Sequence, residues 1–463
     1  MARLEPLEGR LSSILKTEVS GFQTLVECKQ LTAGASQETY ALRTIHTDGE
    51  KKFALRRAQS MLEQEALPGQ TTLAAEAYLL QLAQQSGVPV PNVIYILQPH
   101  DHLGEGYLME WLEGETLGQR IVRAPALAEV RPQLARQCGE ILACIHAIPI
   151  DESLTALLPS VTPATLINET WDAYKDLNIP EPMIDFTARW LLDHLPKSAP
   201  LTLVHGDFRN GNLMIDHRGV QGVLDWELAQ IGNPMRDLGW LCVNSWRFGR
   251  SDLPVGGFGT VDDLLAGYES ITGSAVHRPD LAFWQVFGSF WWSITTLCMA
   301  STWRTGETPS VERPVIGRRS SEAQMDCVNL IIPGRVELPT AKNLDQGQQL
   351  PMPAELLEGV RVFLTEDIAA QAHGRPAFLA KVANNALGIA QRELLQGPQL
   401  ATAEHRRLQA LLGGSEALSI LRWTLVNALR EHLALDTPGL AEHLRHTVAG
   451  RLAVDQPGYH SAP

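Results

Sequence analysis

The sequence predicts an α+β protein with three parts: an N-terminal antiparallel sheet with one helix, a mainly helical lobe, and an all-α C-terminal domain. The chain has 463 residues, which is too long for a single compact core. Short β-like runs gather near the N-terminus, and helical spacing dominates the remainder. We therefore expect an N-terminal lobe at 1–112, a helical lobe at 113–336, a linker at 337–353 and a helical domain at 354–463.

The N-terminal lobe alternates β-like runs with one helical stretch. Leu73, Glu76 and Leu80 recur at helical spacing, which predicts a helix from Leu73 to Gln85. The following Gly-Val-Pro-Val-Pro segment ends this helix and begins an extended strand. The β-like runs cover 39–44, 52–56, 93–97 and 106–111.

The helical lobe has one exception to its helical texture. The segment LVHGDFRNGNLMID…GVLDWE combines short β runs with loops. Farther along, six aromatic residues fall between Phe283 and Trp292, most of them on one helical face. We favour a hydrophobic core for this face. The alternative is an apolar wall for a substrate, with Trp291 as a candidate substrate-binding residue.

The linker and the C-terminal domain differ in composition. Residues 337–353 are rich in Gln, Pro, Asn and Gly. Beyond them, Leu356, Val360 and Phe363 mark one apolar helix face. Asn384 and Asn385 sit inside a helical pattern, where asparagine is unfavourable, so we expect them to make a specific contact.

The composition excludes several classes of function. A formal net charge of −14 argues against a nucleic-acid partner. Six scattered cysteines without a C-x-x-C pair are typical of reduced thiols in a cytosolic protein. The apolar segment Phe283 to Ala300 is interrupted by polar residues, which favours a buried helix over a membrane span. We expect a cytoplasmic protein that does not cross a membrane.

The strongest chemical signal lies between His205 and Asp225. Asp207 can orient or deprotonate an attacking hydroxyl group. Asn212 follows five residues later, and Asp225 follows an apolar run, so both can offer oxygen ligands to magnesium. This order and spacing match the catalytic loop of kinases.

Two other interpretations of this segment are weaker. Asp, Asn and Gly are common in turns, so any one of these residues alone would indicate only a polar loop. A metal hydrolase using His205, Asp207 and His217 would require a second ligand cluster, and the sequence has no spaced H-x-E or H-E-x-x-H motif.

Over about 25–335 the sequence resembles the aminoglycoside phosphotransferase-like kinases, a branch of the protein-kinase-like bilobal fold. The shared motifs are LMEWLEG, HGDFRNGN, LDWELAQIGNP and DLGW. The resemblance implies that Asp207 is the catalytic aspartate and that Asn212 and Asp225 are metal ligands. It also implies that His205 and Asp237 support the active-site loops. A helix N-cap is the alternative role for Asp237.

The resemblance also assigns nucleotide binding to the N-terminal lobe. Gly34 and Ser36 lie in a turn like the one that covers the phosphates in the family. Arg56 stands where a kinase carries its phosphate-binding lysine, as in the hydroxyacyl-type branch. Glu76 is its expected partner, and Arg57 should face the opposite side as a solvated charge.

The segment at Glu110 and Trp111 resembles the hinge whose backbone meets adenine, although an amphipathic edge strand would look similar. The segment at Arg318 and Arg319 resembles one found in the kinases associated with acyl-CoA dehydrogenases. Its arginines could bind a coenzyme A phosphate, or they could be solvated charges at a helix start.

The C-terminal domain resembles a small helical domain of unknown function, DUF6285, that otherwise occurs beside such kinases. We expect it to dock in cis on the catalytic lobes. The sequence therefore predicts a kinase that uses ATP and Mg²⁺ to phosphorylate a hydroxyl group, with a 4-hydroxyacyl-CoA as the expected substrate. A kinase of a sugar, an amino alcohol or an aminoglycoside is the second hypothesis, and a non-catalytic pseudokinase scaffold is the third.

Overall fold

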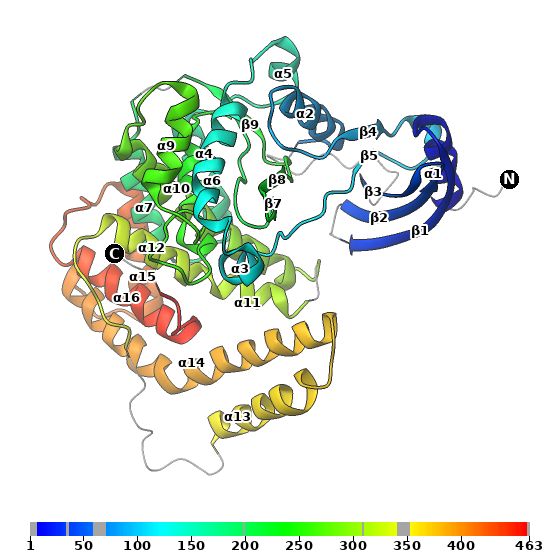
Figure 1. The fold of residues 1–463 in the computed structure, drawn as a ribbon. Helices are drawn as coiled ribbons and strands as arrows, with labels where there is room; N and C mark the ends of the chain where they lie inside the picture. The colour runs from blue at the N-terminus through cyan, green and yellow to red at the C-terminus, as the bar shows by residue number, and fades with distance from the viewer. Residues whose placement is uncertain are drawn as a thin grey trace. The chain divides into compact units, whose positions relative to one another are not determined.

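The computed structural model describes residues 7–33, 37–58, 71–197, 200–307, 310–339 and 352–460. The backbone packs into two compact units, each assembled from separated stretches of the chain (Figure 1). The first unit comprises 1–162, 198–242 and 246–281, and the second comprises 163–197, 243–245 and 282–463. These units differ from the parts expected from the sequence at 1–112, 113–336, 337–353 and 354–463. The expected domain boundaries stay a prediction.

The first unit contains all the strands of the described chain. A five-stranded antiparallel sheet has the order β1-β2-β3-β5-β4, and the two-stranded pairs β6-β9 and β7-β8 lie in its helical part. The elements are α1 (Leu7–Glu18), β1 (Phe22–Ala33), β2 (Gln37–His46), β3 (Gly49–Ala58), α2 (Leu73–Gln85), β4 (Val93–Ile96), β5 (Gly106–Glu110), α3 (Gly118–Arg123), α4 (Arg131–His146), α5 (Glu152–Leu157), β6 (Thr202–Val204), β7 (Leu213–Asp216), β8 (Gly219–Val223), β9 (Gln230–Gly232), α8 (Met235–Leu241) and α9 (Val261–Thr272).

The two faces of the large sheet carry different cores. Because side chains alternate along a strand, Leu55 and Arg56 of β3 point to opposite faces. Leu55 packs with Leu11 and Leu15 of α1, and Tyr107 of β5 joins the core of α2 and α4 on the other face. The alternation therefore places Arg56 on the face toward α2.

Helix α2 spans the residues that the sequence predicted. Thr72 caps its N-terminus by accepting a hydrogen bond from the Ala75 amide at 3.2 Å. Its C-terminus is followed by Gly87, whose φ of 78° is a left-handed conformation suited to glycine. The helix buries Glu76 together with its leucines and alanines. One buried carboxylate on an apolar face requires a cationic partner.

The second unit is helical. Its aromatic helix α10 buries Phe283, Trp284, Phe287 and Phe290, which confirms the expected hydrophobic core. Among the helices described in the chain, none has the length and hydropathy of a membrane span. The elements are α6 (Pro163–Asp176), α7 (Pro182–Asp193), α10 (Arg278–Arg304), α11 (Glu312–Arg318), α12 (Ser320–Ile331), α13 (Pro353–Phe363), a π-helix (Leu364–Ala369), α14 (Arg375–Leu412), α15 (Leu418–Glu431) and α16 (Leu440–Asp455).

Helices α13 and α14 of the second unit run side by side (Figure 1). Asn384 of α14 accepts a hydrogen bond from Arg361 Nε of α13 at 3.1 Å. The specific contact expected from an asparagine inside a helix is therefore present.

Candidate active site

Asp207 lies in the loop between β6 and β7 and is held by three side-chain N–H groups. Trp240 Nε1 of α8 and Arg209 Nε donate to its Oδ1 at 2.8 and 2.9 Å. Asn212 Nδ2 donates to its Oδ2 at 2.6 Å. Asp207 is only 8 % exposed. These donors fix the direction of the carboxylate. A carboxylate that acts on one substrate hydroxyl needs such a fixed direction.

Asn212 connects the Asp207 loop to the segment that follows β8. Its amide nitrogen donates to the backbone oxygen of Asp207 at 3.0 Å as well as to the carboxylate. Its own backbone oxygen accepts from the Leu224 amide at 2.8 Å. Because the nitrogen is used by Asp207, the amide oxygen of Asn212 is the atom that can serve as a metal ligand.

Asp225 follows β8 in an unusual backbone conformation. Its φ is 66°, a left-handed value that is uncommon for residues other than glycine and best tolerated by Asn and Asp. Its Oδ1 accepts from an Arg56 nitrogen at 2.8 Å, and its side chain is 29 % exposed. A residue held in this conformation at a site opening is typical of functional positions.

Asp237 is buried completely and binds the backbone of the Asp207 loop. Its two carboxylate oxygens accept from the His205 and Gly206 amides, both at 2.8 Å. His146 Nε2 of α4 donates to it at 3.1 Å. Burial alone would raise the pKa of Asp237, but the hydrogen bond from His146 and the neighbouring donors hold it below the ordinary value. The helix N-cap expected as an alternative is wrong, because α8 begins at Met235 after Pro234 at its N-cap and Asp237 lies inside its first turn.

His205 links the Asp207 loop to the segment before Asp225. Its Nε2 donates to the Leu224 backbone oxygen at 3.1 Å, and its Nδ1 accepts from the Asp207 amide at 3.2 Å. Burial lowers the pKa of His205, against the raising effect of the nearby carboxylates. A neutral ring with one donor and one acceptor fits both hydrogen bonds.

Arg56 brings the sheet and α2 to the same site. Its Nε lies 3.2 Å from Glu76 Oε2 and donates to Gln37 Oε1 at 2.9 Å. A terminal nitrogen binds Asp225 and lies 3.6 Å from Glu227 Oε2. Burial alone would lower the pKa of Arg56, but Glu76, Tyr107 and Asp225 raise it above its ordinary value. One guanidinium therefore holds a β3 strand, a helix and the Asp225 segment together.

Arg57 differs from its prediction. It was expected to be a solvated charge, but it forms an ion pair with Glu38 at 2.8 Å and only 20 % of its side chain is exposed. Tyr40 also donates to the Glu38 carboxylate, at 2.9 Å. The ion pair joins β3 to β2, because Arg57 and Glu38 lie opposite each other in the two strands. Spacing along the chain does not reveal this partner.

Three carboxylates surround the single Arg56 guanidinium. Burial raises the pKa of Glu76 to about 7, and Arg56 opposes this shift. Burial and Asp225 likewise raise the pKa of Glu227 to about 7. The cluster thus carries more acidic groups than one cation neutralises. Together with the oxygen donors of Asn212 and Asp225, this surplus fits a hard divalent cation that also binds phosphates, because Mg²⁺ uses one or two carboxylates there.

The other expected nucleotide-binding residues are less connected. Glu110 lies exposed at the end of β5, where its backbone amide donates to the Asn92 oxygen at 2.8 Å. Trp111 is partly buried, and its Nε1 has no hydrogen-bond partner among the described residues. Gly34 and Ser36 lie outside the described residues.

The expected substrate-binding residues belong to the second unit. Trp291 is partly buried and stacks on Trp292 with ring centroids 6.4 Å apart. Arg318 pairs with Asp455 at 3.0 Å and with Glu393 at 3.1 Å. Arg319 pairs within its own helix start with Glu322 at 3.1 Å. The two arginines thus pair with acids while 47 % and 39 % of their side chains stay exposed, as partly solvated charges at a helix start would.

Sequence reasoning missed several supporting residues. His146 joins Asp237 to Tyr268. The Nδ1 of His146 lies 3.0 Å from the Tyr268 hydroxyl. Trp240 belongs to the DLGW motif and Glu227 to the LDWELAQIGNP motif. Their positions in these motifs could have identified both residues. His146 has no such signal, because it is the last residue of an ordinary amphipathic helix.

Residues 27–273, just over half of the chain, match the phosphotransferase enzyme family. Residues 370–459 match a domain of unknown function, DUF6285. A crystal structure of a Ralstonia eutropha protein described as an aminoglycoside phosphotransferase superimposes with a TM-score of 0.52 at 22 % identity, covering 68 % of this chain and 95 % of that one. This likeness shows the fold.

Two relatives are acyl-CoA dehydrogenase family members. Member 10 from Mus musculus is 28 % identical over 249 residues, covering 52 % of this chain and 22 % of that protein. Member 11 from Homo sapiens is 27 % identical over 244 residues, covering 49 % of this chain and 30 % of that protein. The chain thus spans less than a third of either relative.

Proposed function

Because this chain belongs to the phosphotransferase enzyme family, we propose that it transfers the terminal phosphoryl group of ATP to a hydroxyl group of a 4-hydroxyacyl-CoA, with Mg²⁺ bound at Asn212 and Asp225. The observation that carries the proposal is the convergence of Asp207, Asn212, Asp225 and Arg56 in one unit. Asn212 contacts the Asp207 carboxylate at 2.6 Å, and Arg56 contacts Asp225 at 2.8 Å.

The residues divide the work as phosphoryl transfer requires. Asp207 accepts the proton of the acceptor hydroxyl while that oxygen bonds to the transferred phosphorus and the bond to the leaving diphosphate breaks. Trp240 and Arg209 keep the carboxylate oriented during this step. Arg56 binds phosphate oxygens through its paired N–H groups. When bound, Mg²⁺ supplies charge neutralisation for the phosphates.

Asp237 and His205 position the Asp207 loop. Asp237 fixes the loop through two backbone amides, and His205 spans from that loop to Leu224. Neither side chain needs to touch a substrate. Gly34 and Ser36 complete the proposal as the turn over the phosphates, and Glu110 and Trp111 complete it at the adenine.

The substrate class rests on the relatives, which are named for acyl-CoA chemistry and share 26–28 % identity with this chain. The phosphotransferase family itself spans several acceptors, so the site alone does not choose among them. In this proposal the C-terminal domain docks in cis.

A substrate panel tests the acceptor. The full chain is incubated with ATP and MgCl₂ and with a 4-hydroxyacyl-CoA, the matching acyl-CoA without the hydroxyl, choline, a hexose or kanamycin. ADP release and the mass of the product are measured. We expect ADP and a product heavier by one phosphoryl group with the 4-hydroxyacyl-CoA only. Turnover of choline, the hexose or kanamycin without turnover of the thioester contradicts the proposed substrate but keeps the phosphotransferase.

A further inference from the structure

The second unit contains a cavity of about 700 Å³. Helices α10, α11, α12, α14, α15 and α16 contribute to its wall, together with the residues just before α7. Its volume lies within the range typical of small-molecule binding sites. All the residues that line the cavity belong to the second unit, whereas Asp207 and the residues around it belong to the first.

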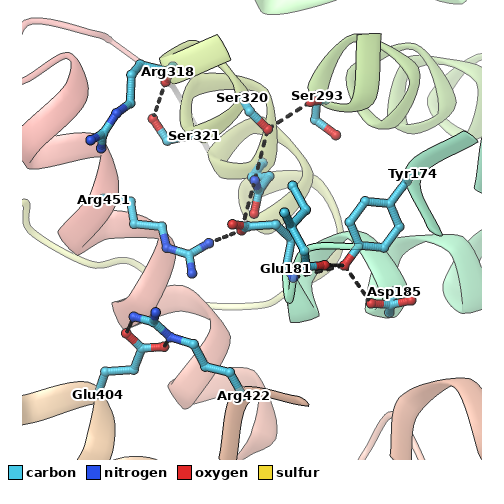
Figure 2. A network of polar contacts seen from close by, with 12 residues as sticks. Tyr174, Glu181, Asp185, Ser293, Arg318, Ser320, Ser321, Glu404, Arg422 and Arg451 are labelled. Carbon is cyan, nitrogen blue, oxygen red and sulfur yellow. Dashed lines mark hydrogen bonds and ion pairs between the residues drawn. The ribbon is translucent and has the colours of Figure 1, made fainter. Parts of the chain in front are cut away.

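One side of the cavity is lined by arginine–carboxylate pairs. Figure 2 shows Arg422 of α15 in a bidentate pair with Glu404 of α14, at 2.7 and 2.5 Å. Arg451 of α16 reaches toward Glu181 and forms an ion pair with it. Arg318 pairs with Asp455 at 3.0 Å. In each pair the acid already has a cation, so these carboxylates are not free to bind a cationic ligand.

Two arginines of this wall, Arg407 and the exposed Arg304, form no ion pair among the described residues, and Arg407 is the less exposed of the two. It lines the cavity from α14, and a terminal nitrogen donates to the Thr447 hydroxyl at 3.2 Å. Its Nε is buried and has no hydrogen-bond partner in the part of the chain that the structure describes. No ion pair within 4.0 Å is formed by Arg407 in the described ranges. A buried donor on an unpaired cation costs free energy unless a further group binds it.

His443 adds no charge that could compensate Arg407. It is 1 % exposed on α16, and neither ring nitrogen has a partner within the part of the chain that is described. Burial lowers its pKa to about 3, and the positive charges of Arg407 and Arg422 contribute to the lowering. His443 is therefore neutral and leaves the charge of Arg407 uncompensated.

A second unsatisfied group lies on α12. Gln324 lines the cavity and is 3 % exposed. Its amide nitrogen donates to Ser320 Oγ at 3.0 Å. Its Oε1 is buried and accepts no hydrogen bond from any described residue. An acceptor and a donor are thus both left open in the wall of one cavity.

Part of the cavity wall is apolar. Leu297, Ala300 and Trp303 follow each other along α10 at three-residue spacing, and all three line the cavity. Leu400 of α14 lines it as well. The wall therefore combines an unpaired guanidinium with an apolar strip, which is the lining expected for a ligand with one charged and one apolar end.

We infer that this cavity binds an organic anion that places its phosphate or carboxylate group at Arg407 and its apolar portion along α10. The anion pairs with the Arg407 guanidinium, which forms no ion pair among the described residues, and supplies the partner that Arg407 Nε lacks. A hydroxyl or amide N–H on the ligand can donate to Gln324 Oε1.

Titration calorimetry of the full chain tests this inference with ligands that share one apolar tail. The ligands are octyl phosphate, octanoate, octanol and octylammonium. We expect one molecule of octyl phosphate or octanoate to bind per chain, and octanol and octylammonium to bind at least about tenfold more weakly. The better of the two anions identifies the acidic group.

The variant Arg407→Gln should weaken binding of that anion by about tenfold or more. Arg406→Gln is the matched control, because Arg406 is the exposed neighbour on the same helix and does not line the cavity. It should change affinity by less than about twofold. Arg407→Lys, which keeps the charge, should retain part of the affinity, and it serves if the glutamine variant does not fold.

Three results would overturn the inference. The first is octylammonium binding as tightly as the anions. The second is no saturable binding of either anion to the wild-type chain. The third is equal loss of affinity in Arg407→Gln and Arg406→Gln, or in Arg407→Lys and Arg406→Gln where the glutamine variant does not fold.

Discussion

The carboxylates of the first unit differ in how they are held, and this difference separates their roles. Asp207 receives three side-chain N–H groups, Asp237 receives two backbone amides and a histidine, and Asp225 receives one arginine nitrogen and stays partly exposed. Fixed, buried acceptors suit orientation, and an exposed acid suits a ligand that arrives from solvent. The three carboxylates therefore have different environments, and these suit the different roles proposed for them.

Replacing Asp237 with Asn should destabilise the first unit by roughly 3 kcal/mol at neutral pH. The amide keeps one acceptor oxygen but places an NH₂ donor against a backbone N–H donor, so one buried hydrogen bond becomes a clash of donors. The free energy of unfolding in guanidinium measures the change. Asp252→Asn is the control, because Asp252 is 64 % exposed and pairs only with its neighbour Arg250 among the described residues. Equal effects of the two variants would contradict the buried role.

The loss of stability in Asp237→Asn should depend on pH. The folded pKa of Asp237 lies below its ordinary value of 3.8, so its charge stabilises the fold above the unfolded pKa. This contribution is lost as the pH falls through the folded value. The difference in unfolding free energy between the wild-type chain and Asp237→Asn should therefore be constant from about pH 7 to pH 5 and shrink below about pH 4. A difference that grows on acidification would contradict the sign.

Replacing Arg56 with Lys should weaken Mg-ATP binding by about tenfold. A single ammonium group cannot contact Glu76 and Asp225 while also presenting paired N–H groups to a phosphate. Arg57→Lys is the matched control on the same strand, because its charge pairs with Glu38 instead of the site. Calorimetric titration with Mg-ATP measures both variants. Equal losses would mean that Arg56 acts through strand stability and not through phosphate contact.

At the scale of elements, the sequence predicted mainly the features that residues close together in the chain determine. Helix α2, strands β2 to β5 and the loop between β6 and β7 follow from spacing, caps and turn residues close in sequence. Helix α1 and strand β1 were not predicted. The Arg56–Glu76 pair also follows, because a strand and the next helix bring them together. His146 could not be predicted, since its bond to Asp237 joins residues 91 positions apart and depends on how α4 packs.

The aromatic face of α10 gives a prediction about stability. Phe290 is 0 % exposed in this helix, and Phe363 of α13 is 51 % exposed. Phe290→Ala should lower the free energy of unfolding by about 3–5 kcal/mol, because a buried ring leaves a cavity. Phe363→Ala should change it by less than about 0.5 kcal/mol. Chemical denaturation of both variants measures this, and a similar cost for the two would contradict α10 as a core helix.

At the scale of the molecule, the second unit mixes distant parts of the chain. Helices α7, α11 and α12 pack with α14, α15 or α16, although the sequence placed the former in the catalytic lobe. Asp185 of α7 shows why: it is 0 % exposed, and Arg430 of α15 donates to it at 2.7 Å. A contact across 245 positions leaves no local signature, so composition could mark the linker but not this packing.

A chain ending at Glu337 should consequently not stay folded as an active protein. Its second unit would keep the buried carboxylate of Asp185 without Arg430, and breaking a buried charge pair costs about 3–5 kcal/mol. It would also expose the faces of α7 and α12 that contact α15 and α16. Soluble yield, thermal unfolding and ATP turnover of the shortened chain measure the effect. A shortened chain with full stability and full kcat/KM would contradict both the packing and the cis-docked domain.

The central claim is that Asp207 takes part in phosphoryl transfer, and the variant Asp207→Asn tests it most directly. ADP formation with the accepted substrate is followed for the wild-type chain, Asp207→Asn and the exposed control Asp252→Asn. We predict that kcat falls by at least about a hundredfold in Asp207→Asn, as loss of a general base does, while Mg-ATP affinity changes little. The control should match the wild-type chain. An Asp207→Asn enzyme with wild-type kcat would remove Asp207 from the mechanism.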